Sequence, residues 1–235
     1  MIEYMIIVVL LIICPVLSQI AFKKGIRKGS EDFFKLLVAF GFESKVKAFK
    51  VLNESVLPGG IVFVGDSITQ DYPVSEWFQG HLVYNRGIGG DTTEGLLKRM
   101  DVSIFDLKPK TVIFLMGTND FVLLNKTAEQ VAETIESIIK LIKSNHPDIH
   151  IIIQSIYPVN PLIDSFTVGK RSNRIIQETN ALLKMIKDIT FLDVYPLLSD
   201  ASGHLKTEYS HDGLHVNMHG YKIITQAIKE ILKIR

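Results

Sequence analysis

The sequence predicts an α/β domain in which a parallel β-sheet is covered by helices on both faces. From Gly59 onward, short apolar runs rich in β-branched residues alternate with longer amphipathic runs. The short runs are apolar throughout, which is typical of strands buried on both faces. Alternation of such strands with helices is the pattern of a parallel sheet with helical crossovers. The chain has 235 residues, 47% of them hydrophobic, which is enough for one sizeable core.

Five short runs are the candidate strands. The clearest are IVFVG at 61–65, TVIFLMG at 111–117 and IHIIIQSI at 149–156, and the weaker ones are LVYN at 82–85 and TFLDV at 190–194. We therefore expect about five parallel strands.

Three longer runs are the candidate covering helices. They span 127–144, 172–188 and 218–234, and each places its apolar residues on one face. Thr127, with Gln130 three residues later, forms a capping-box pattern that predicts where the first of them begins.

The N-terminal part of the chain departs from this pattern. The run MIIVVLLIICPVLSQIAF, from Met5 to Phe22, has 18 residues without a charge, and KKGIRKG follows it. A run of that length can cross a bilayer. No positive segment precedes it, and Ile13 stands where a lipoprotein cleavage site would need a small residue, so we expect an anchor that is not cleaved. A buried core helix is the alternative.

Three domains follow from these observations. They are a membrane anchor over 1–28, an amphipathic helical connector over 29–58 and the α/β domain over 59–235. The basic residues after the apolar run favour a domain on the cytoplasmic side of a single-pass anchor. An esterase that acts at the cell surface would need the opposite orientation.

Charge and cysteine content exclude several classes of protein. Lysine and arginine number 26 against 25 acidic residues, so no basic field for binding nucleic acid is present. Cys14 is the only cysteine, which excludes an internal disulfide framework and a cysteine-rich metal site.

Small and polar residues follow the first three candidate strands. GDS at 65–67, NRGIGGD at 85–91 and GTND at 117–120 all stand where the chain leaves a strand. Ligands bind at the carboxyl ends of strands in such sheets. Ser67 in the first block is a nucleophile, a helix N-cap or a turn residue.

A histidine near the C-terminus is the candidate base. The segment YSHDGLHVNMHGY at 209–221 places Asp212 three residues before His215, so the carboxylate can orient the imidazole. His211, His215 and His219 are spaced four apart, which is also a metal-ligand spacing, although Gly213 opposes a continuous helix there.

Two further residues could supply hydrogen-bond donors to an oxyanion. Gly90 offers a backbone N–H that a substrate can approach without a Cβ in the way. Asn119 offers a side-chain amide, with an Asx-turn as the alternative interpretation.

The blocks GDS, NRGIGGDTT, GTND and DGLH together resemble the SGNH, or GDSL, hydrolases, in the order and spacing of that family. The resemblance covers about residues 60–233 and is greatest to the branch of platelet-activating-factor acetylhydrolase subunits and small bacterial acyl-esterases. It implies a three-layer α/β/α flavodoxin-like fold and ester hydrolysis without metal or cofactor. In that family's terms Ser67 is the nucleophile, His215 the base and Asp212 its orienting acid. The same resemblance makes the Ser67 N–H, the Gly90 N–H and the Asn119 amide the oxyanion hole.

The substrate is less well defined by the sequence. The loop at 157–173 is long enough to be a lid or a binding loop, with a surface insertion as the alternative. Within it Tyr157, Arg171 and Asn173 are possible substrate-binding residues. The resemblance suggests short acyl groups, such as acetyl on a carbohydrate or a lipid. The main rival is a lysophospholipase or thioesterase acting at the membrane, and a non-catalytic binding module would need a broken triad.

Overall fold

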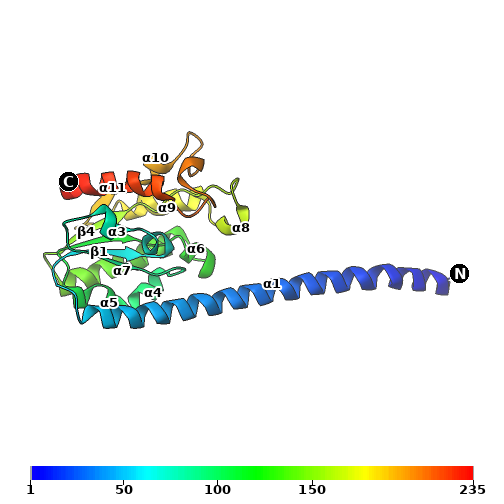
Figure 1. The fold of residues 1–235 in the computed structure, drawn as a ribbon. Helices are drawn as coiled ribbons and strands as arrows, with labels where there is room; N and C mark the ends of the chain where they lie inside the picture. The colour runs from blue at the N-terminus through cyan, green and yellow to red at the C-terminus, as the bar shows by residue number, and fades with distance from the viewer. Residues whose placement is uncertain (1, 235) are drawn as a thin grey trace. The chain divides into compact units, whose positions relative to one another are not determined.

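The computed structural model describes the backbone of residues 2–234 and the side chains of residues 22–25, 28–29 and 32–234. Within it the chain divides into two compact units, Met1–Gly41 and Phe42–Arg235. The second unit holds the sheet and the helices that cover it (Figure 1).

One long helix, α1 (Ile2–Asn53), forms the N-terminal region and ends inside the second unit. This one helix spans nearly all of the residues assigned from the sequence to an anchor (1–28) and to an amphipathic connector (29–58). The predicted anchor at 5–22 falls, except for Phe22, on residues whose side chains lie outside the description. Among the described residues, no helix has the length and apolar character needed to span a membrane.

The last turns of α1 pack within the second unit. Phe49 is buried, and the guanidinium of Arg86 lies over its ring at 4.8 Å from the centroid. Asn53 accepts a hydrogen bond from Arg86 Nη2 at 2.8 Å and donates one to Val102 O at 2.7 Å. The end of α1 therefore belongs to the α/β unit.

The core of the second unit is a sheet of five parallel strands in the order β2-β1-β3-β4-β5. This confirms the expected number and direction of the strands. The structure shortens three of the predicted runs at their carboxyl ends and extends the second strand to Gly87. The strands are β1 (Ile61–Gly65), β2 (Val83–Gly87), β3 (Thr111–Leu115), β4 (His150–Gln154) and β5 (Thr190–Leu192).

Helices cover both faces of the sheet, as the apolar strands predict. Alternate strand residues point to opposite sides, so that Val62 and Phe114 enter one hydrophobic core and Phe63 and Ile113 the other. The first core packs against α4 (Thr93–Leu97), α5 (Met100–Ser103), η1 (Phe105–Leu107), α7 (Ala128–Asn145) and α9 (Asn173–Leu183). The second packs against α2 (Ser67–Gln70), α3 (Val74–Trp77), α10 (Tyr195–Leu198) and α11 (Met218–Leu232).

The three predicted covering helices are present. The capping box of α7 is formed as predicted, because Thr127 Oγ1 accepts from Gln130 N and Gln130 Oε1 accepts from Thr127 N. The short helices were not predicted from the sequence. Elements of four or five residues bury too few side chains to produce a detectable period. The remaining short elements are α6 (Asp120–Leu123), α8 (Ser165–Val168) and η2 (Thr207–Tyr209).

The strand order locates the binding edge of the sheet. The chain passes from β1 outward to β2, and then returns across β1 to place β3 on its other side. Such a reversal opens a crevice at the carboxyl ends of the central strands. The loops that follow β1, β2 and β3 carry the GDS, GIGGD and GTND blocks to this edge.

Candidate active site

Ser67 is the first residue of α2, and only Asp66 separates it from the end of β1. The cap of this helix is Asp66, whose Oδ1 accepts a hydrogen bond from Ile68 N at 2.9 Å. The N-cap interpretation of Ser67 is therefore wrong, because its neighbour performs that role. The Ser67 hydroxyl is left free to bond elsewhere, and its Oγ lies 3.0 Å from His215 Nε2.

Asp212 contacts the ring nitrogen of His215 that is not used by Ser67. Its Nδ1 lies 2.7 Å from Asp212 Oδ2, and Asp212 Oδ1 accepts from the backbone N–H groups of Leu214 and His215. Burial opposes ionisation of Asp212, yet these hydrogen bonds hold the pKa of its carboxyl below the ordinary value. The imidazole thus has a charged acceptor on one nitrogen and the Ser67 hydroxyl on the other.

The loop that carries this pair is ordered by Ser210 and Gly213. Ser210 Oγ donates to His215 O at 2.7 Å and accepts from Gly213 N at 2.9 Å. Gly213 has a φ of +76°, and a Cβ there would lie 2.2 Å from Asn160 O. Only glycine satisfies both restrictions, which explains its place between the acid and the histidine.

Hydrogen-bond donors lie in the neighbouring blocks. In the described part of the chain, the backbone N–H groups of Ser67 and Gly90 make no hydrogen bond. Gly90 has a φ of +73°, a conformation that favours glycine. Asn119 makes no Asx-turn; its Nδ2 donates to Asp91 O at 2.9 Å and its Oδ1 accepts from Arg171 Nη2 at 2.7 Å.

A buried ion pair joins the first two blocks. Arg99 Nε lies 2.8 Å from Asp91 Oδ2, and both side chains are almost completely buried. The same guanidinium donates to Gly65 O at the end of β1 and to Arg86 O in β2. Arg99 therefore fixes the loop that carries Gly90 relative to the strand that carries Ser67.

A second buried carboxylate joins the second and third blocks. Asp120, directly after Asn119, accepts hydrogen bonds from the backbone N–H and the hydroxyl of Thr93. Lys126 Nζ lies 3.4 Å from the same carboxylate. Neither of these pairs was predicted from the sequence.

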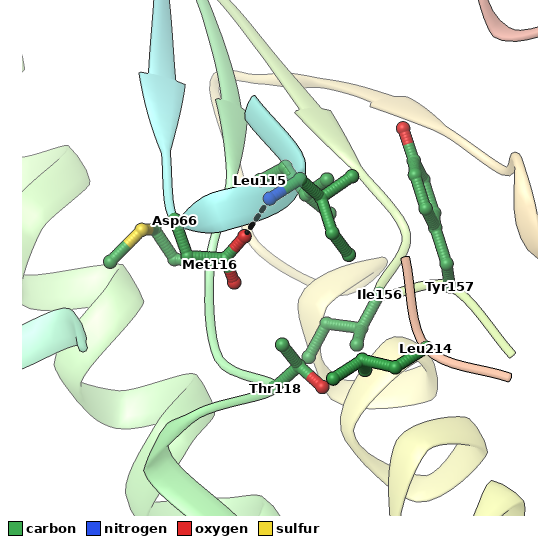
Figure 2. A pocket seen from close by; sticks show the side chains of 8 residues that line it. Asp66, Leu115, Met116, Thr118, Ile156, Tyr157 and Leu214 are labelled. Atoms are coloured by element: carbon green, nitrogen blue, oxygen red, sulfur yellow. Dashed lines mark hydrogen bonds between the residues drawn. The ribbon is translucent and has the colours of Figure 1, made fainter. Parts of the chain in front are cut away.

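Asp66 also borders a small cavity, whose lining side chains are drawn in Figure 2. Its side chain is buried, and Oδ2 has no hydrogen-bond partner among the described residues. The pKa of Asp66 is raised from the ordinary value of 3.8 to about 7, and burial of the carboxyl is the largest cause. The cavity is lined by Asp66, Ile68, Leu115, Met116, Thr118, Ile156, Tyr157 and Leu214.

We expect Asp66→Asn to remove a pH dependence of stability. Asparagine copies the protonated carboxyl, because its oxygen can still accept from Ile68 N. The folded protein holds the Asp66 proton more tightly than the unfolded chain, so the stability that this proton contributes is lost as pH rises from about 4 to about 7. The free energy of unfolding of the wild type should fall relative to that of the variant by up to about 1.4 kcal/mol per pH unit in this window. Urea unfolding of both proteins at several pH values measures the difference, and a constant difference would contradict the assignment.

The three candidate substrate-binding residues lie in different environments. Tyr157 is buried and lines the small cavity, with its hydroxyl donating to Gln154 Oε1 at 2.6 Å. Asn173 bonds to both the N–H and the carbonyl of Val159. Arg171 contacts Asn119. All three side chains have partners within the protein in this structure.

The histidines at 211 and 219 are both exposed. Within the described ranges, no group of three or more histidine, cysteine, aspartate or glutamate side chains is arranged to hold a metal ion.

Comparison with known proteins agrees with this geometry. Residues 63–223 match the GDSL-like Lipase/Acylhydrolase family. The chain is 30% identical over 181 residues to the platelet-activating factor acetylhydrolase IB subunit alpha2 of Rattus norvegicus. The aligned region covers 73% of this chain and 75% of that protein. The human subunit of the same name gives the same identity and coverage.

Solved structures show the same fold. A candidate platelet activating factor from Streptococcus pneumonia has a TM-score of 0.80 at 30% identity, covering 86% of this chain and 98% of that one. A GDSL-like lipase from Bacteroides thetaiotaomicron has a TM-score of 0.70 over 80% of this chain and 97% of that one. At 23% identity, the second match shows the fold alone.

The family match spans the blocks that contain Ser67, Gly90, Asn119 and His215, which the structure brings to one edge of the sheet. The resemblance seen in the four sequence blocks is thereby confirmed. The chain belongs to the GDSL-like lipase/acylhydrolase family and is a serine hydrolase.

Proposed function

We propose that the protein is a metal-independent esterase that hydrolyses short-chain acyl esters through an acyl-enzyme on Ser67. One observation carries this proposal: the continuous set of contacts from Ser67 Oγ through His215 to Asp212, at 3.0 and 2.7 Å. A serine hydroxyl becomes a useful nucleophile when a base accepts its proton during the attack. Here the protein's own side chains supply the nucleophile, the base and the group that orients the base.

The reaction follows from this arrangement in two halves. Ser67 Oγ attacks the ester carbonyl carbon while its proton passes to His215 Nε2, and Asp212 stabilises the imidazolium. The tetrahedral intermediate collapses as His215 protonates the leaving alcohol, and the acyl group stays on Ser67. A water molecule then attacks the acyl-enzyme with His215 again as base, which releases the acid and restores the hydroxyl.

The negative charge on the carbonyl oxygen needs donors that are in place before the reaction. The unpartnered N–H groups of Ser67 and Gly90, together with the Asn119 amide, are the proposed donors. Losing one such donor typically lowers the rate about 10²–10³-fold, which corresponds to roughly 3–4 kcal/mol in the transition state.

A short acyl group is the substrate class that we propose, with acetyl on a carbohydrate or a lipid as the leading case. The triad lies in an open position, because the side chains of His215 and Asp212 are 37% and 33% exposed. The mammalian relatives are named for acetyl hydrolysis, which supports the same class.

One observation favours a second candidate, hydrolysis of longer lipid esters at a membrane. The loop after β4 carries two very exposed apolar side chains, Leu162 at 83% and Phe166 at 92%. The same loop packs Asn160 against Gly213 in the histidine loop. Such side chains could contact a lipid or an acyl chain beside the triad.

A series of p-nitrophenyl esters from acetate to palmitate separates the two candidates. We expect kcat/KM to be greatest for acetate and to fall with chain length, because an open site gives a long chain little surface to bury. We also expect the double variant Leu162→Ser, Phe166→Ser to leave acetate hydrolysis near the wild-type value. A maximum at long chains that this variant abolishes would overturn the short-chain proposal in favour of a lysophospholipase or thioesterase.

We further propose that the N-terminal region holds the enzyme at a membrane. The 18 uncharged residues at 5–22 support this, as do the exposed apolar residues Phe33, Leu37 and Phe40 that follow them in α1. Extraction of the full chain with detergent, but not with alkaline carbonate, would be the expected result, and carbonate extraction would contradict it. Protease digestion of intact cells then determines on which side of the membrane the domain lies.

A further inference from the structure

Arg171 packs directly against the proposed oxyanion donor Asn119, although its loop lies more than fifty residues later in the chain. Its Nη2 donates to Asn119 Oδ1 at 2.7 Å, and its Nε donates to Thr118 O at 3.1 Å. Its Nη1 donates to Thr167 O and to Val168 O, at 3.3 and 3.0 Å. The guanidinium therefore ties α8 and its flanking loop to the end of β3.

All of these acceptors are neutral oxygens. Among the residues whose side chains are described, no carboxylate lies within ion-pair distance of Arg171. Burial lowers the pKa of the guanidinium, and the charge of Asp66 offsets part of that effect. Burying half of a cation without an ion-pair partner costs desolvation free energy. The simplest explanation for the position of Arg171 is therefore that its hydrogen bonds have a function.

The contact with Asn119 distinguishes the two ends of the amide. Oxygen and nitrogen of an asparagine amide are nearly the same size, so packing alone fixes its orientation poorly. Arg171 can only donate and therefore selects the amide oxygen, while Asp91 O can only accept and therefore selects Nδ2. One N–H of Nδ2 is then left without a partner among the residues that the structure describes.

We propose that Arg171 is a positioning residue that orients and polarises the Asn119 amide for the oxyanion. This inference rests on the proposed function, in which Asn119 is an oxyanion donor. A positive charge on the oxygen side of the amide draws electron density from nitrogen and makes its free N–H a stronger donor. The effect is greatest when negative charge develops on the substrate, so Arg171 acts on the transition state more than on substrate binding.

The direct test is a double-mutant cycle between Arg171→Met and Asn119→Ala, with p-nitrophenyl acetate as substrate. We expect Asn119→Ala to lower kcat about 10²–10³-fold and Arg171→Met to lower it at least about 10-fold, with KM close to the wild-type value in both. In the Asn119→Ala background, Arg171→Met should cause almost no further loss, because the amide through which it acts is gone.

Arg174→Met is the matched control. Arg174 lies three residues later on the same segment, is exposed and pairs with Glu178 on the surface of α9. We expect this variant to keep wild-type turnover. If thermal unfolding shows that Arg171→Met is poorly folded, Arg171→Gln replaces it in the cycle, since glutamine keeps a polar N–H donor but carries no charge to polarise the amide.

The outcomes separate the inference from the proposed function. Independent, multiplicative losses in the cycle, or a raised KM with unchanged kcat, would overturn the positioning role while leaving the esterase intact. A raised KM with unchanged kcat would indicate that Arg171 binds the substrate. Wild-type turnover in Asn119→Ala would show that the proposed oxyanion hole itself is wrong.

Discussion

Ser67→Ala is expected to lower kcat for p-nitrophenyl acetate by about 10⁶-fold, to the level that the remaining groups support. The hydroxyl at 3.0 Å from His215 Nε2 is the atom that forms the acyl-enzyme, and alanine offers no replacement. The fold should survive, because the cap of α2 is Asp66 and the serine is only half-buried. Steady-state kinetics on the purified full chain, with thermal unfolding beside them, measures both expectations.

Ser137→Ala is the matched control for this loss. Ser137 is exposed on α7, and its hydroxyl donates to Glu133 O within the helix. It should therefore keep wild-type turnover. A Ser67→Ala enzyme with near wild-type turnover would refute the assignment of the nucleophile.

His215→Ala is expected to reduce turnover to a similar extent, because the serine and its base act as one unit. For the same reason the double variant Ser67→Ala, His215→Ala should be no slower than either single variant. The imidazole contacts both Ser67 and Asp212, so its removal separates the hydroxyl from the carboxylate. Steady-state kinetics of the three variants tests this coupling.

His219→Ala separates this account from the metal interpretation of the three histidines. His219 is exposed at the start of α11, and its backbone N–H donates to the cap residue Asn217. We expect it to keep wild-type turnover with or without a chelator. A large loss in His219→Ala, restored by added metal, would indicate a metal site instead of a base.

The sequence was sufficient to predict the parts of the site that depend on local patterns. The apolar runs before Ser67 and Asn119 are strands, and parallel strands bring their carboxyl ends to one edge of a sheet. The spacing of Asp212 and His215 confines that pair to one loop. These relations follow from the strand period and from short separations along the chain, which a single sequence shows directly.

The side chains that hold the blocks together could not be predicted in this way. Arg99 belongs to none of the blocks or periodic runs of the sequence, yet it is buried against Asp91 and bonded to Gly65 O. Asp120 looks like a turn residue, yet it bonds Thr93, 27 residues earlier. Each pairing depends on how loops from different strands pack together, and no local pattern in the sequence predicts that packing.

For two polar residues the tertiary fold, and not the sequence, identifies the hydrogen-bond partners. A helix cap is one of the roles that the sequence allows for Ser67, and in the structure the neighbouring Asp66 is the cap. Arg171 is a possible contact for a polar substrate from the sequence, and in the structure its hydrogen bonds go to Thr118, Asn119 and the backbone of α8. In both cases the residue type indicated polar chemistry correctly, but the partner was set by the tertiary fold.

The most direct test of the central claim is covalent labelling with a fluorophosphonate, followed by intact mass measurement and peptide mapping. We predict that the wild-type chain gains a single phosphonyl group, and that this group maps to Ser67. Labelling should be lost in Ser67→Ala and greatly slowed in His215→Ala, because the base at 3.0 Å is needed to activate the hydroxyl. Undiminished labelling of Ser67→Ala, or a label that maps to another residue in the wild type, would contradict the account.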